Sequence, residues 1–249
     1  MTELGVVFYE GPSVLTGDPI VAVATGLEGG SRNLKTGPIV QTWMVRPDMA
    51  PAEAVRLNLD DAICGDCALR GHDGRDRGCY VTPWLAPNNV FKALDAYPVV
   101  TWRALRALVE GRVVRVGAYG DPVALPFEVW REVLGGASGW VGYTHQWRNC
   151  DPRFRDLVMA SVESEGDAAV ARAAGWRTFR VRRDLEEPLT PGVEVVCPAS
   201  DEAGHRTTCE QCELCRGASV QARSVVIAAH GKPSTMRVWR RSAEGMVKA

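Results

Sequence analysis

The sequence predicts an α/β protein built on a complete or partial (β/α) barrel with parallel strands, with a small N-terminal β unit and cysteine-bearing metal loops. Three observations lead to this class. Apolar runs typical of strands alternate with helical patterns over the second half of the chain, an order that favours parallel strands joined by right-handed crossovers. The number of these strands fits a barrel better than an open doubly wound sheet. Polar residues directly follow several strands, where folds of this class carry their chemistry.

The composition is that of a folded domain. The chain has 249 residues, of which 46% are hydrophobic and 24% charged, and we expect a single domain over residues 1–249. The formal net charge of −1 gives no overall basic field that would indicate nucleic-acid binding. No run approaches the ~18 apolar residues of a membrane span, and the start lacks a signal-peptide pattern. We therefore expect no membrane association and a cytoplasmic location, where reduced thiols are available to metals.

Residues 1–37 are expected to form the N-terminal β unit. Apolar runs at residues 5–9 and 19–24 are separated by glycine-containing turn signals. A polar, glycine-bracketed loop follows at residues 29–37. Its backbone N–H groups and Lys35 could bind phosphate, although the loop lacks the residue order of a P-loop, and an ordinary turn before a strand is the other interpretation.

Residues 38–232 are expected to form the barrel-like core, with metal loops at residues 64–79 and 197–215, and residues 233–249 a tail. The predicted strands of the core cover residues 39–45, 113–119, 140–144, 157–162, 178–181, 193–196 and 224–229. The predicted helices cover residues 51–59, 126–134 and 165–174. We find no internal repeat.

Unusual polar residues follow the predicted strands. Residues 117–122 have the sequence Gly-Ala-Tyr-Gly-Asp-Pro, and the next strand ends in Thr-His-Gln-Trp at residues 144–147. Because the carboxyl ends of parallel strands share one edge, we expect these side chains to meet there. The candidate catalytic residues are Asp121, Tyr143, His145, Gln146 and Glu163.

The first cysteine group lies in residues 64–79. Cys64 and Cys67 form a C-x-x-C pair, whose turn directs both sulfurs to one side, and Cys79 follows a polar loop. With His72 or an open position, three thiolates complete a tetrahedral zinc site or a cuboidal iron–sulfur centre. An open position admits a substrate or cofactor, so this group is the better candidate for chemistry.

The second group consists of Cys197, Cys209, Cys212 and Cys215. Successive gaps of two residues are typical of ferredoxin-type ligation, and zinc ribbons can use the same residues, so both metals stay open here. Four thiolates fill a tetrahedral coordination sphere, which indicates a structural site. Cys150 is isolated in the sequence and is expected to be a core thiol.

These motifs resemble an uncharacterised cysteine-rich family of bacteriophages and bacteria. The resemblance is carried by residues 11–13, the loop at residues 31–37, the Cys-Gly-Asp-Cys pair with residues 78–80, residues 117–122, residues 142–147 and the Cys-Pro-Ala-Ser run beginning at Cys197. It covers nearly the whole chain. It implies an origin, with the host cytoplasm as location for a phage-encoded protein, and no activity.

A second resemblance is to radical S-adenosylmethionine enzymes. They carry three cysteines after the first barrel strand for a four-iron four-sulfur cluster, and a glycine-rich acidic motif after the second strand that meets the cofactor. By this resemblance Cys64, Cys67 and Cys79 hold the cluster, and Gly117, Gly120 and Asp121 bind S-adenosylmethionine. The spacing here is C-x2-C-x11-C, whereas the family pattern is C-x3-C-x2-C, so the resemblance supports the architecture more than the reaction.

Three functions are compatible with these features. The first is an iron–sulfur barrel enzyme that modifies a nucleotide, nucleic acid or peptide. The second is a zinc-binding nucleic-acid processing protein with His145 or Asp121 as general base, although the usual zinc-hydrolase and deaminase motifs are missing. The third is a non-enzymatic binding module with structural metals. The substrate and the oligomeric state are not predicted by the sequence.

Overall fold

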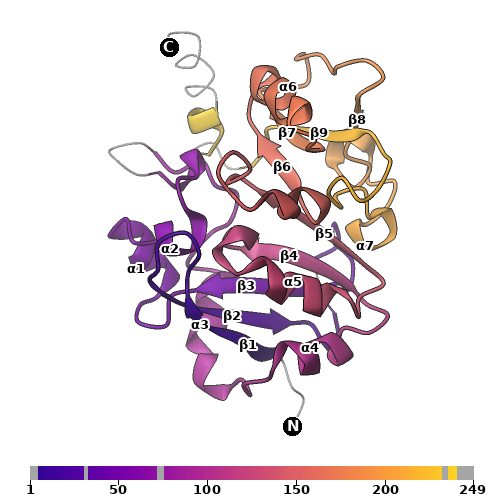
Figure 1. The fold of residues 1–249 in the computed structure, drawn as a ribbon. Coiled ribbons are helices and arrows are strands. Elements are labelled where there is room, and N and C mark those ends of the chain that lie inside the picture. Colours follow the sequence, from indigo (N-terminus) through magenta and orange to yellow (C-terminus); the bar gives the residue numbers. More distant parts are fainter. Residues whose placement is uncertain (1–4, 31–32, 72–75, 232–234, 240–249) are drawn as a thin grey trace.

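In the computed structural model, which describes residues 5–30, 33–71, 76–231 and 235–239, the strands join into one nine-stranded sheet (Figure 1). The strands are β1 (Gly5–Pro12), β2 (Pro19–Thr25), β3 (Val40–Val45), β4 (Val113–Tyr119), β5 (Gly139–Thr144), β6 (Met159–Val162), β7 (Thr178–Arg182), β8 (Glu194–Val196) and β9 (Ser224–Ala228). The α-helices are α1 (Pro51–Arg56), α2 (Asp61–Cys64), α3 (Ala86–Lys92), α4 (Trp102–Leu108), α5 (Phe127–Leu134), α6 (Glu165–Ala173) and α7 (Cys209–Cys212). The 3-10 helices are η1 (Ala68–Arg70), η2 (Leu94–Ala96), η3 (Pro122–Ala124), η4 (Pro152–Asp156) and η5 (Asp201–Ala203).

The sheet runs in the order β1-β2-β3-β4-β5-β6-β7-β9-β8. The strands β1, β2 and β3 are antiparallel neighbours, so the N-terminal β unit is continuous with the core. All neighbours from β3 onward are parallel. Within the described ranges no ladder joins the edge strands β1 and β8, and the sheet is open. The predicted mixed α/β class with mainly parallel strands is therefore confirmed, whereas a closed barrel is not.

Some elements differ from the sequence expectation for local reasons. The helix predicted over residues 51–59 ends at Arg56, because Asn58 takes a left-handed conformation with φ of 58°. The strand predicted from residue 157 begins at Met159, because Leu157 closes the preceding 3-10 turn by donating its N–H to Phe154 O at 2.9 Å. The helices α3 and α4 were not predicted, although Thr101 caps α4 by accepting from the Ala104 N–H.

The two faces of the sheet are covered differently. Helices α4, α5 and α6 pack on the outer face, where Phe8 and Trp130 meet edge to face at 6.0 Å within a large hydrophobic cluster (Figure 1). The opposite, inner face carries a second cluster that includes Cys67, Cys197 and Cys215. Both cysteine groups therefore pack against the inner face. No helix in the described part of the chain is long and apolar enough to cross a membrane.

Candidate functional site

A cavity of about 190 Å³ lies where the parallel strands β4 to β6 end. Cys64, Cys67 and Cys79 line it together with His145 and Ser161 from the strand ends. The residues Gly117, Gly120, Asp121 and Tyr143 also line it. The first cysteine group and the polar strand ends, far apart in the sequence, thus share one cavity, which we call the cysteine cavity.

A buried ionic network holds the loop that carries these cysteines. Asp60 is 1% exposed and accepts from Arg70 Nε at 3.0 Å and from Arg77 Nη1 at 3.1 Å. Arg70 Nη1 also donates to the Gly65 carbonyl at 2.9 Å, inside the C-x-x-C turn. One carboxylate therefore ties both ends of the loop together, and each buried charge has an opposite partner.

The backbone completes the loop. The N–H groups of Gly78 and Cys79 both donate to the Leu69 carbonyl, at 3.1 and 3.0 Å, and return Cys79 to the C-x-x-C turn. Burial raises the pKa of the Cys64 and Cys79 thiols, so both are protonated at neutral pH without a metal. All eight cysteines are free thiols.

The glycine-rich turn after β4 is shaped by steric requirements. Gly120 has φ of 84°, and a Cβ there would come within 2.8 Å of the Met44 Cβ, so only glycine fits. The Asp121 N–H donates to the Ile63 carbonyl at 2.6 Å, which fixes this turn against α2. Gly117 also has a positive φ of 79°. The backbone geometry of this turn therefore accounts for both glycines without a bound cofactor.

Asp121 is buried, and its carboxylate accepts hydrogen bonds from neighbouring groups of the protein. Its Oδ1 accepts from the Thr144 hydroxyl at 2.7 Å and the Val123 N–H at 3.1 Å, and its Oδ2 accepts from the His145 N–H at 2.8 Å. Burial raises the pKa of Asp121 and these hydrogen bonds oppose the rise. The carboxylate thereby fixes the end of β5 and the position of His145.

His145 links the cysteine group to a carboxylate. Its Nε2 lies 3.1 Å from Glu163 Oε1, and its ring lies beside Cys67 in the cysteine cavity. Burial alone would lower the pKa of His145, but Cys67 and Glu163 outweigh it and raise the pKa well above its usual value. Gln146 completes the contact, since its Nε2 donates to the Cys64 carbonyl at 3.0 Å. Of the expected catalytic residues, His145 and Gln146 therefore lie against the cysteine loop, and Glu163 reaches it only through His145.

The second cysteine group lies farther from the carboxyl ends of β4 to β6, although Cys197 itself directly follows β8. Cys197, Cys209, Cys212 and Cys215 line a small cavity of about 30 Å³ with Lys35 and Tyr143. The N–H of Cys209 donates to the Lys35 carbonyl before β3, and Glu213 lies against Gly139, the first residue of β5. This group thus contacts the amino ends of β3 and β5, whereas the sequence placed the chemistry at the carboxyl ends alone.

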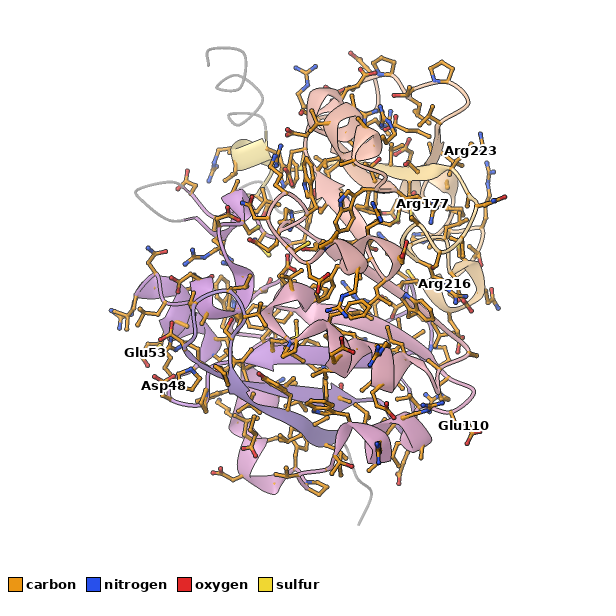
Figure 2. The ribbon with its side chains drawn as sticks, in the orientation of Figure 1. Asp48, Glu53, Glu110, Arg177, Arg216 and Arg223 are labelled. Carbon is orange, nitrogen blue, oxygen red and sulfur yellow. The ribbon has the colours of Figure 1, made fainter. Side chains whose placement is uncertain are left out.

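Arg177 anchors the segment that follows Cys215. Its guanidinium donates to the carbonyls of Leu214, Arg216, Gly217, Ala222 and Arg223, at distances from 2.5 to 3.2 Å. Figure 2 shows Arg177 next to the labelled Arg216 and Arg223 on this side of the molecule. Burial lowers the pKa of Arg177. The second cysteine loop is therefore held in place before any metal binds.

As they stand, the described residues contain no group of three or more His, Cys, Asp or Glu side chains placed so that it could hold a metal ion. His72, the fourth ligand considered from the sequence, lies outside the described residues. The donor chemistry nevertheless suits thiophilic metals, since each group presents three or four thiols to one cavity. Cys150 lies apart from both groups and lines a separate pocket near Phe127 and Arg153.

The structure adds residues that the sequence analysis did not select. Tyr80 and Trp239 line the cysteine cavity, and their rings stack at 5.7 Å. Trp239 was assigned to a solvated tail, but it is 3% exposed and its Nε1 donates to the Gly78 carbonyl at 3.1 Å. Arg115 was treated as part of a strand and points into the same cavity. In the sequence, the burial of Trp239 was indicated only by the presence of a large apolar ring among the basic residues of the tail.

Comparison with protein-family models, with curated proteins and with solved structures returned no match.

Proposed function

We propose that this chain is an enzyme with an iron–sulfur centre on Cys64, Cys67 and Cys79, similar to radical S-adenosylmethionine enzymes, that acts on a nucleotide, nucleic acid or peptide. The observation that carries the proposal is the cysteine cavity. It joins three thiols with the polar ends of β4 to β6 at the edge where α/β proteins carry out chemistry.

The size and shape of the two cysteine sites favour different metals. Zinc binds thiolates at about 2.3 Å, which requires sulfurs within about 4 Å of one another. The first group shares a cavity of about 190 Å³, which has room for a cuboidal cluster whose ligands lie farther apart than those of a single ion. The second cavity, of about 30 Å³, has room for one ion, so we propose structural zinc there.

The residues of the chain would act around the cluster in the following way. Cys64, Cys67 and Cys79 would hold the cluster, which would supply one-electron chemistry to a cofactor bound in the cysteine cavity once an external reductant had reduced it. Asp121 holds the β5 end, and His145, oriented by Glu163, lies beside Cys67 and would limit the movement of its sulfur. Tyr80 and Trp239 cover the cavity and restrict the entry of water.

The experiment is anaerobic reconstitution of the full chain with iron and sulfide, followed by metal and sulfide analysis. We expect about four irons per chain, and we expect Cys64→Ala, Cys67→Ala and Cys79→Ala each to lose them. Cys150→Ala is the matched control, because Cys150 lies in a different pocket and should keep the full iron content. Zinc without iron or sulfide in the reconstituted protein would contradict the proposal.

A zinc enzyme is the second candidate, and one contact favours it. His145 lines the same cavity as the three thiols, so a small side-chain movement would place a nitrogen donor beside them. A Cys₃His set is typical of zinc. The same metal analysis separates the candidates, since one zinc per chain that is lost in both Cys67→Ala and His145→Ala would select this alternative.

A further inference from the structure

A wide cleft of about 520 Å³ extends from the cysteine cavity across the inner face of the sheet. Strands β3, β4, β5 and β7 contribute Trp43, Arg115, Tyr143 and Phe179 to it. Tyr80, Arg115, Tyr143 and Phe179 line both the cleft and the cysteine cavity, so the two spaces adjoin. The volume is in the range of small-molecule sites.

The charge of the cleft has one sign. Lys35 and Arg115 line it, and none of the described residues that line it is an aspartate or a glutamate. Within the described part of the chain, no hydrogen bond or ion pair involves the guanidinium of Arg115 or the ammonium of Lys35. By contrast, the arginines Arg70, Arg177 and Arg180 each donate several hydrogen bonds. Cys209 also lines the cleft, and its sulfur is the acidic group that lies near both cations. Two cations without a carboxylate partner in a concave space indicate an anionic ligand.

The walls of the cleft are aromatic. Tyr80 stacks on His230 with ring centroids 4.9 Å apart and an interplanar angle of 20°. Tyr143 and Phe179 meet at 4.4 Å on the adjoining part of the inner face. Flat rings of this kind accept a planar heterocycle by stacking, without regard to its identity.

We propose that this cleft binds a nucleotide, with its phosphate on Arg115 and Lys35 and its base against the aromatic wall that includes Tyr80. The inference deepens the proposed function by naming the substrate class of the same site, and it rests on that function for its role as substrate. A neutral peptide would leave both cations unpaired, whereas a nucleotide satisfies the cations and the rings together. The position beside the cysteine cavity places the bound nucleotide next to the proposed cluster.

Binding to the full chain is measured by titration calorimetry at low salt, both as isolated and after reconstitution. The probes are the four nucleoside monophosphates, the matching nucleosides and inorganic phosphate. We expect monophosphates to bind at least about tenfold more tightly than nucleosides, because a charge-assisted phosphate contact contributes that much. Arg115→Gln should remove this difference, and Tyr80→Leu should weaken every nucleotide about fivefold or more.

Arg103→Gln is the matched control, because Arg103 is exposed on α4 and is not among the residues that line the cleft. It should bind as the unchanged protein does, and an unchanged circular dichroism spectrum and melting temperature establish that Arg115→Gln is folded. A tetranucleotide that binds with the same dependence on Arg115 would also support the proposal and would assign the site to a nucleotide within a strand.

Equal affinity for monophosphates and nucleosides, or unchanged binding in Arg115→Gln, would overturn the proposal. So would the absence of binding by both mononucleotides and the tetranucleotide. Iron content is measured on the same samples, so the two proposals fail separately. A protein that contains iron and binds no nucleotide contradicts only this inference, and a protein without iron that binds nucleotide contradicts only the iron–sulfur proposal.

Discussion

At the scale of single residues, Asp60 supports the proposed site without lining its cavity. Its carboxylate bridges Arg70 and Arg77, and Arg70 in turn holds the Gly65 carbonyl between Cys64 and Cys67. The position of the first cysteine group therefore depends on a buried charge. The sequence showed the cysteine spacing but gave no indication that Asp60 was its support.

We expect Asp60→Asn to lower the free energy of unfolding by about 3 kcal/mol, because Arg70 and Arg77 both lose the carboxylate with which they pair. The same change should strongly reduce the iron bound by the first group, since the loop is no longer fixed. Denaturant unfolding and iron analysis test both effects. Asp48→Asn is the matched control: Asp48, labelled in Figure 2, pairs with Arg46 but is 53% exposed, so its loss should cost no more than about 1 kcal/mol. Equal costs in the two variants would contradict this role of Asp60.

At the scale of elements, the edge strand β8 is joined to the sheet by a buried ion pair as well as by its ladder with β9. Glu194 of β8 pairs with Arg180 of β7 at 2.7 Å, and both side chains are fully buried. Glu187 also contacts Arg180, at 2.5 Å. β9 lies between β7 and β8 in the sheet, so the Arg180–Glu194 pair reaches across β9. This pair stabilises the strand order β7-β9-β8, in which the last two strands are reversed relative to the sequence.

Burial by itself would raise the pKa of Glu194, but the hydrogen bonds and charge of Arg180 outweigh it, and the pKa lies below its usual value of 4.5. A carboxylate whose pKa is lower in the folded than in the unfolded state stabilises the fold at pH values above its unfolded-state pKa. This stabilisation is lost as the pH falls through the folded-state pKa. We expect Glu194→Gln to be less stable than the unchanged protein at pH 7 by about 3 kcal/mol. The difference should shrink below a pH of about 4, as measured by denaturant unfolding across the pH range. A difference independent of pH would show that packing, rather than charge, accounts for the cost.

At the scale of the whole molecule, the first cysteine group lies at the carboxyl ends of β4 to β6, the second contacts the amino ends of β3 and β5, and the two cavities share Tyr143. They are held by different supports, Asp60 with its arginines for the first and Arg177 for the second. We therefore expect them to bind metal independently.

Cys212→Ser is expected to lose zinc and to lower the melting temperature by several degrees, because a bound metal stabilises only the folded state. The iron bound by Cys64, Cys67 and Cys79 should stay within about a fifth of its original amount under the same anaerobic reconstitution. Metal analysis and calorimetry on the two variants Cys212→Ser and Cys64→Ala check the separation. Loss of both metals in each variant would show one coupled site.

The sequence by itself determined the strands, the mixed α/β class with mainly parallel pairing, and the division of seven cysteines into two groups. These features follow from local patterns, because the period of a strand, the residues of a turn and the spacing of ligands are each visible within a short segment of sequence. The sequence also predicted that Asp121, His145 and Glu163 lie close together, because the carboxyl ends of parallel strands share one edge of the sheet. Only the tertiary structure decided that the sheet is open and that β9 lies between β7 and the edge strand β8. It alone placed Arg115, Tyr80 and Trp239 on one inner surface, because contacts between residues more than thirty positions apart depend on strand order and register, which no local pattern records.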